Sequence, residues 1–119
     1  MKFLFLLHGD AEAEAPLPAE ERMRIVGEHM AYTKMLRDLG VYVSGEALDD
    51  PRSSVVVRPG ENPIVTDGPF AETKEAIGGF YVIDVADMDV ALDLCRILPE
   101  GYTIEVRPVI QIEGDDSGS

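Results

Sequence analysis

The chain has 119 residues, a hydrophobic fraction of 45 % and a formal net charge of -13, from 10 Lys and Arg against 23 Asp and Glu. This length suits a single domain with one core, and the composition argues against wholesale disorder. The acidic surface disfavours nucleic acid and anionic membranes as partners, because no basic run offsets the charge.

Residues 2–9, KFLFLLHG, predict a first strand rather than a signal peptide. The apolar run ends at Leu7, and no small-residue cleavage site follows it. Apolar side chains occupy both alternating faces of this run, so both faces need cover. Because no stretch approaches the roughly 18 apolar residues of a membrane span, we expect a cytoplasmic protein.

Residues 18–39 change to a helical period. Pro18 and two acids open the segment, and Gly40 closes it. An apolar stripe that contains one histidine steps by four, three, four and three residues through Ile25, His29, Tyr32, Leu36 and Leu39, with Val26 and Met30 beside it. The pattern predicts an amphipathic helix whose stripe faces the core.

Three elements are expected in the middle of the chain. Residues 41–48 predict a second strand, and residues 53–58 and 62–67 predict a short hairpin. The stretch TDGPFAETKEAIGG then predicts a helix of about two turns over residues 69–77. Pro69 suits the first helical position, and Gly78 and Gly79 suit the positive-φ conformation that ends a helix.

The C-terminal part predicts a strand, a helix and a strand. Residues 79–86 are apolar on both faces, which is typical of an internal strand. Asp87 is expected to cap a helix over residues 88–98. Residues 102–112 predict the last strand, with Glu105 and Arg107 on one face. Residues 113–119 predict a disordered acidic tail, so the domain is expected to span residues 1–112.

Without the inserted hairpin and short helix, the element order is βαββαβ. This is the ferredoxin-like α+β plan, in which two helices cover one face of an antiparallel sheet. The first and third core strands are nevertheless apolar on both faces. A second copy of the sheet would cover the open face, so we expect a face-to-face homodimer.

Several motifs resemble one known family. DGPFAETKE and GGFYVIDV, followed by EVRPV and preceded by EHM, LRDLGV and GEAL, resemble the YCII-related family, and more closely its subgroup named for the DGPF motif. The resemblance runs from Lys2 to about Ile112. It implies a dimeric α+β barrel in which a histidine and acidic residues meet in a pocket of a small enzyme. Because genes of this subgroup often accompany extracytoplasmic-function sigma factors, it also implies a regulatory association.

His29 is the first candidate catalytic residue. It lies in an apolar stripe where leucine would pack better, and an imidazole with an ordinary pKa of about 6.5 is suited to acid–base work. The alternative is a core histidine bonded to the backbone. As an acid–base group, His29 requires a pocket and a carboxylate partner, for which Asp67 and Glu46 are expected.

Asp67 is the second candidate catalytic residue, in the role of orienting His29 or sharing its proton. The same carboxylate can instead serve the fold by bonding N–H groups at the start of the expected short helix. Glu46, Glu105 and Arg107 are expected to bind substrate if their strand faces line the dimer interior. The alternative for Glu105 and Arg107 is a surface pair on an edge strand.

Metal and cofactor binding are not expected. No HxxxH or HxxxE spacing marks a site on one helix face, and two adjacent glycines lack the pattern of a phosphate-binding loop. Cys95 lies in an apolar stripe and predicts a buried, unreactive thiol. Two hypotheses follow: an acid–base enzyme acting on a small organic molecule, or a non-catalytic ligand-binding or regulatory dimer that works beside a sigma factor.

Overall fold

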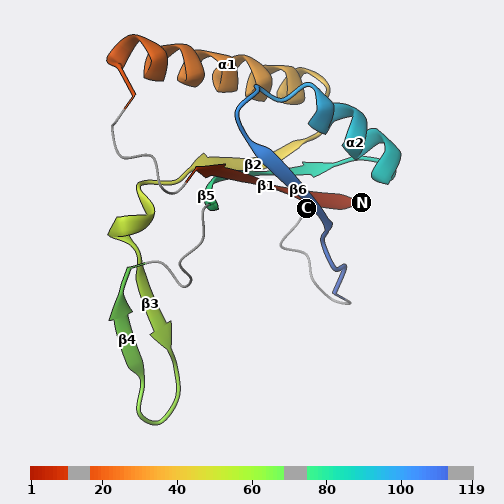
Figure 1. Cartoon of the computed structure of the whole chain (residues 1–119). Helices are drawn as coiled ribbons and strands as arrows, with labels where there is room; N and C mark the ends of the chain where they lie inside the picture. The colour runs from red at the N-terminus through yellow and green to blue at the C-terminus, as the bar shows by residue number, and fades with distance from the viewer. Residues whose placement is uncertain (11–16, 69–74, 113–119) are drawn as a thin grey trace.

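The computed structural model describes residues 1–10, 17–68 and 75–112, and its largest unit is a four-stranded antiparallel sheet with helices on one face (Figure 1). The strand order is β2–β5–β1–β6, and this order with the intervening helices confirms the ferredoxin-like α+β prediction. The elements of this unit are β1 (Lys2–Asp10), α1 (Ala19–Asp38), β2 (Tyr42–Ala47), β5 (Glu75–Asp84), α2 (Met88–Arg96) and β6 (Thr103–Pro108).

The predicted hairpin is a separate two-stranded unit. It consists of β3 (Val55–Arg58) and β4 (Ile64–Asp67), preceded by the short 3₁₀ turn η1 (Pro51–Ser53), which the sequence pattern did not reveal. Figure 1 shows the hairpin extending away from both helices. The predicted acidic tail lies outside the described residues. Neither α1 nor α2 is long and apolar enough to cross a membrane, within the part of the chain that was described.

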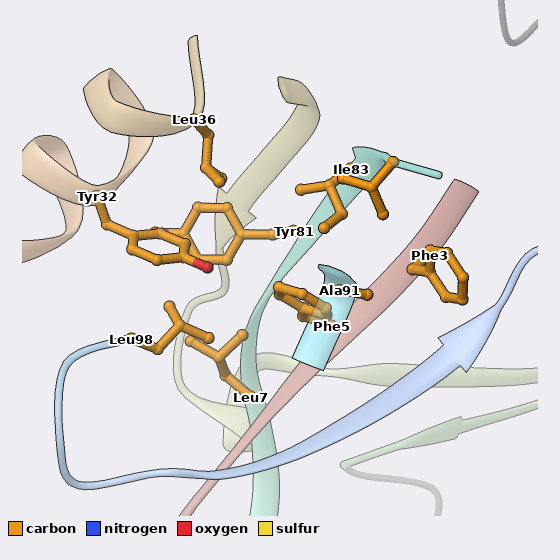
Figure 2. Packing of buried hydrophobic residues seen from close by; sticks show 10 residues of the cluster. Phe3, Phe5, Leu7, Tyr32, Leu36, Tyr81, Ile83, Ala91 and Leu98 are labelled. Carbon is orange, nitrogen blue, oxygen red and sulfur yellow. The ribbon is translucent and has the colours of Figure 1, made fainter. Parts of the chain in front are cut away.

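The core lies between the sheet and the helices (Figure 2). Phe3 and Phe5 of β1 are fully buried and pair across the ladder with Ile83 and Tyr81 of β5. Leu36 of α1 is also fully buried over this layer. The other buried apolar members are Leu7, Tyr32, Val85, Ala91 and Leu98. Burial of this set removes apolar surface from water, which is the main force that holds α1 and α2 against the sheet.

Helix α1 departs from its predicted core stripe in one respect. Tyr32 and Leu36 are buried, but Leu39 is exposed, and the exposed fractions of Val26 and Met30 are 56 % and 67 %. The N-terminal half of the helix therefore does not pack closely on the sheet. Its apolar residues lie beside a pocket instead, which is described below.

The predicted short helix over residues 69–77 is wrong at its C-terminal end. Residues 69–74 lie outside the described residues, whereas residues 75–77 belong to β5. Ala76 and Ile77 pair with Gly9 and His8 of β1, so the cross-strand ladder prevails over the local helical signal. Gly79 is not a helix stop: a Cβ at this position would come within 3.0 Å of the Glu46 carbonyl oxygen, so glycine permits close packing of β5 on β2.

The second face of the sheet is apolar at its centre, as predicted. Leu4 and Leu6 of β1 pair with Val82 and Phe80 of β5, and all four side chains are half-buried. They alternate with the residues of the helix-covered face. Of the described elements, neither helix covers this second face (Figure 1).

Asp87 begins α2 as predicted, because its side-chain Oδ1 accepts a hydrogen bond from the Val90 backbone N–H at 3.0 Å. We expect Asp87→Ala to lower the free energy of unfolding by about 0.5–2 kcal/mol, since one helix N–H would lose its partner. Urea unfolding followed by circular dichroism measures this change. Asp93→Ala, in the same helix but away from the cap, serves as the control, and an equal loss in both variants would contradict the capping role.

Candidate functional site

A pocket of about 520 Å³ lies between the N-terminal half of α1 and the β2–β5 edge of the sheet. Apolar residues from α1 and the strands make up much of its lining, and a few polar groups converge on it. This combination is typical of a small-molecule site. The lining residues are Leu7, Ile25, Val26, His29, Met30, Thr33, Lys34, Arg37, Gly45, Glu46, Ala47, Gly78, Gly79, Phe80, Tyr81 and Tyr102.

His29 lines this pocket and is bonded to a tyrosine. Its Nδ1 lies 2.8 Å from the Tyr81 hydroxyl oxygen, and the two rings are stacked with centroids 6.1 Å apart. The Tyr102 ring meets the imidazole edge-on, with the centroids 5.7 Å apart. Nε2 forms no hydrogen bond with the residues that the structure describes, so it is the nitrogen open to a ligand.

A second tyrosine, Tyr32, packs against Tyr81. The Tyr32 ring packs against the Tyr81 ring at a centroid distance of 5.2 Å, and the Tyr32 hydroxyl donates a hydrogen bond to the Leu94 carbonyl at 2.6 Å. Figure 2 shows these two rings side by side between α1 and the sheet. Because Tyr32 is buried and its hydroxyl is hydrogen-bonded to Leu94, its ring restricts the position of the Tyr81 ring, and hence of the hydroxyl that meets His29.

The two bonded groups are both neutral near neutral pH. Burial lowers the pKa of His29, and the nearby Glu28 carboxylate opposes this only in part. Burial likewise raises the pKa of Tyr81. A neutral imidazole has two tautomers. In one, Nδ1 accepts a hydrogen bond from the Tyr81 hydroxyl and Nε2 carries the ring proton. In the other, Nδ1 donates a hydrogen bond to the Tyr81 oxygen and Nε2 is free as a base. Nε2 of His29 therefore carries a proton in one tautomer and a free lone pair in the other.

The lowered pKa of His29 predicts a pH dependence of stability. The unfolded chain, with an ordinary value of 6.5, binds the proton more readily than the folded one. The free energy of unfolding should thus fall as pH drops below 6.5 and level off below the folded pKa. His29→Gln should remove this contribution, whereas His8→Gln should keep it. Urea midpoints of the three proteins measured across this range test the prediction, which fails if the wild type and His29→Gln differ by the same amount at every pH.

Gly45 of β2 sets the place of the Tyr81 ring. A Cβ at this position would lie 2.8 Å from Tyr81 Cδ1, closer than real Cβ contacts allow. We expect Gly45→Ala to lower the free energy of unfolding by about 1–3 kcal/mol and to displace the His29–Tyr81 bond.

Gly27→Ala is the matched control for that substitution. Gly27 lies in α1, and apart from its chain neighbours and the adjacent helix backbone no atom of the described residues lies within 4 Å of its ideal Cβ. Replacing a helical glycine there should raise the free energy of unfolding by about 0.5–1 kcal/mol. Thermal melts and the NMR shifts of the His29 ring check both variants. A Gly45→Ala protein with unchanged stability and unchanged His29 shifts would contradict the packing argument.

Among the described residues, His29 forms no hydrogen bond with either of the two predicted partner carboxylates, Asp67 and Glu46. Asp67 is exposed at the end of β4, where it pairs with Val55, and it does not line the pocket. Glu46 lines the pocket from β2, but it pairs with Phe80, which alternates with Tyr81. Its side chain is therefore directed to the opposite sheet face. The hydrogen-bond partner of His29 is the Tyr81 hydroxyl, not the expected carboxylate.

Glu105 and Arg107 lie together on the second face of the sheet. The Arg107 Nε and the Glu105 Oε2 are 3.9 Å apart, and His8 Nε2 lies 3.2 Å from Glu105 Oε1. Both side chains of the Glu105–Arg107 pair are about half exposed or more, at 48 % and 66 %. These predicted substrate-binding residues form one cluster, but they do not meet His29.

The predicted site missed the tyrosines and the cations of the pocket. Tyr81 and Tyr102 come from strands far along the chain, so no local spacing linked them to His29. A signal was present on α1, however: His29, Thr33 and Arg37 are each four residues apart and thus share one helix face. In the structure all three of these residues line the pocket.

Cys95 is less buried than its apolar stripe predicted. The residue is partly buried and packs against the core, and burial raises the pKa of its thiol. A thiol held in its protonated form is a poor nucleophile.

Comparisons with known proteins agree with the fold and leave the chemistry open. The model of the YCII-related domain matches residues 1–113. An uncharacterized protein of Rhizobium meliloti (strain 1021) is 35 % identical over 115 residues, which cover 92 % of each chain. The family match includes all the residues that line the described pocket.

Proposed function

The chain belongs to the YCII-related domain family, and we propose that it is a small acid–base enzyme acting on a small organic molecule in the His29 pocket. The observation that carries the proposal is the His29 Nδ1–Tyr81 hydroxyl bond at the wall of a largely apolar pocket. A polar pair with opposite pKa shifts in such a pocket is the arrangement expected of a proton-transfer site.

The proposed chemistry is a proton transfer at Nε2 of His29. In the form with Nδ1 protonated, Nε2 removes a proton from the substrate, and Tyr81 accepts the hydrogen bond from Nδ1. The imidazolium formed in this way then returns the proton from Nε2 to a second position of the same molecule, which restores the starting neutral ring. Such a transfer within one substrate needs no oxidant or further reactant. The reaction class is therefore isomerisation or proton exchange beside a carbonyl group.

The motif at the hairpin end supports a finer family assignment. Asp67 and Gly68 begin the sequence DGPF, and we infer that the chain falls in the subgroup named for it. Asp67 stays in this proposal as a second candidate group, whose carboxylate would act on a ligand approaching from the hairpin side. Its exposure and its place in β4 give it no contact with His29.

A homodimer through the second face of the sheet is part of the proposal. Leu4, Leu6, Phe80 and Val82 give that face an apolar centre, which neither helix of the described part of the chain covers. Glu105 and Arg107 border this centre, and their charges are suited to its rim. Sedimentation equilibrium at micromolar protein tests this point, and a monomer there would overturn it.

Hydrogen–deuterium exchange provides the test of the activity. We would incubate the protein in D₂O with a panel of small ketones, keto acids and lactones and follow loss of C–H signals beside the carbonyl by NMR. Catalysed exchange with any member supports the enzyme. Absence of exchange in compounds that demonstrably shift the His29 ring signals contradicts it.

A binding module is the second candidate. The net charge of -13 favours a partner with a basic surface. A sigma factor encoded beside this chain would be such a partner. Ligand binding without exchange, together with capture of that factor by the purified chain, would favour this function.

A further inference from the structure

The pocket has one cationic end in an otherwise acidic protein. Lys34 and Arg37, on the C-terminal half of α1, both line it. The whole chain has only 10 Lys and Arg against 23 Asp and Glu. This end of the largely apolar pocket is therefore positively charged, and the proposed chemistry of His29 and Tyr81 involves neither cation.

Arg37 is the cation available to a ligand. Its guanidinium lies over the Tyr42 ring, 4.8 Å from the centroid, and among the side chains that the structure describes no carboxylate pairs with it. Lys34 differs, because its Nζ is 2.7 Å from Asp38 Oδ2. The stacking on Tyr42 restricts the guanidinium plane and leaves its N–H groups free to meet two oxygens side by side.

The spacing on α1 fixes how a ligand would lie. His29 and Arg37 are eight residues apart, which is about 12 Å along the helix axis. Helical side chains tilt in the same direction, so their ends keep roughly this separation. Between them lie Thr33 and Met30, with Tyr81 across from the helix. A molecule that contacts both ends is elongated, and its middle is apolar.

We propose that the ligand is an elongated monocarboxylic acid with a flat apolar body, whose carboxylate binds Arg37 and whose other end lies at His29 and Tyr81. This inference rests on the proposed function, since it names the ligand class of the same pocket. The rings of His29, Tyr81 and Tyr102 suit a flat body by stacking and edge contacts.

A carboxylate fits the surroundings better than a phosphate does. Asp38 lies beside Lys34, and Glu28 is close enough to the pocket to act on His29. Since Lys34 is paired with Asp38 and no described carboxylate pairs with Arg37, this end of the pocket offers one unmatched positive charge, which suits a monoanion. The Glu46 carboxylate, by contrast, is directed to the other sheet face by strand alternation and does not oppose the ligand at Arg37.

The test compares an acid with its uncharged isostere. Phenylpentanoate and its primary amide have the same shape, so calorimetric titration of both isolates the charge. We expect the wild type to bind the acid about 10- to 100-fold more tightly than the amide, as charge-assisted hydrogen bonds to a guanidinium provide. Arg37→Gln should abolish this preference and leave the amide affinity unchanged. Arg37→Lys should restore only part of it.

Arg96→Gln is the matched control, because Arg96 pairs with Asp93 on α2 and does not line the pocket. It should keep the full acid preference. Equal affinities for acid and amide in the wild type, or a preference that survives Arg37→Gln, would overturn this inference and leave the pocket function intact. Failure of both compounds to bind the wild type would also overturn it. Deuterium exchange decides the proposed function separately. Phenylpentyl phosphate binding more tightly than the acid would assign the cationic end to phosphate esters instead and contradict the carboxylate.

Discussion

Replacement of His29 by Gln is expected to lower turnover about 10²- to 10⁴-fold, the range for loss of a general acid–base group. Glutamine is similar in size to the imidazole and keeps a hydrogen bond to Tyr81, but it cannot take up or release a proton at neutral pH. Ligand affinity should therefore change little. Deuterium-exchange rates and calorimetric affinities, measured on the same substrate, separate the two effects.

His8→Gln is the control for this experiment. His8 lies on the second face of the sheet beside Glu105, so its loss should leave exchange rates within a factor of about two. Tyr81→Phe should lower the rate less than His29→Gln does, since Nε2 remains in place. An exchange rate for His29→Gln equal to that of the wild type would contradict the acid–base role and favour the binding module.

Phe5→Ala should lower the free energy of unfolding by about 3–5 kcal/mol. Phe5 is fully buried at the centre of the sheet, between Tyr81 of β5 and Val106 of β6. Truncation leaves a cavity that these neighbours cannot fill without moving the strands that carry them. Denaturant unfolding followed by tyrosine fluorescence and by circular dichroism measures the loss.

Met23→Ala is the control for the core substitution. Met23 is on α1 with 75 % of its side chain exposed, and it does not line the pocket. Its truncation should change the free energy of unfolding by no more than about 0.5 kcal/mol. Similar losses in both variants would mean that the sheet centre is not the principal core.

Local patterns were sufficient for the central fold. The alternating apolar residues of β1 and β5 predicted a sheet with two apolar faces, and Asp87 predicted the start of α2. The short helix failed at residues 75–77 for a physical reason: pairing with β1 is a long-range interaction that no local signal reports. The same glycine pair suits a helix end or a close strand contact, and only the position of Glu46 distinguishes them.

The candidate site was less accessible to sequence reasoning. His29 was found because one histidine interrupts an apolar stripe. Its partner Tyr81 is 52 residues away along the chain, and the packing of Tyr32 behind it depends on the fold. Asp67 was a candidate because it begins the DGPF motif and precedes the expected short helix, but strand pairing places it in the hairpin. The packing of the elements, rather than the residue types, determined which of the candidate residues contact His29.

The position of β1 has a consequence for how the chain acquires its structure. This first strand is central and pairs with β5 on one side and β6 on the other, and His8 meets Glu105 across 97 positions of sequence. During synthesis β1 leaves the ribosome before either of its neighbours, so the complete four-stranded sheet forms only when β6 has left the exit tunnel. A large loop must close at that step, which makes folding slow relative to helical proteins of this size. Until then the apolar side chains of β1 are open to other chains, and a chaperone that binds short apolar segments would find a target at residues 2–7.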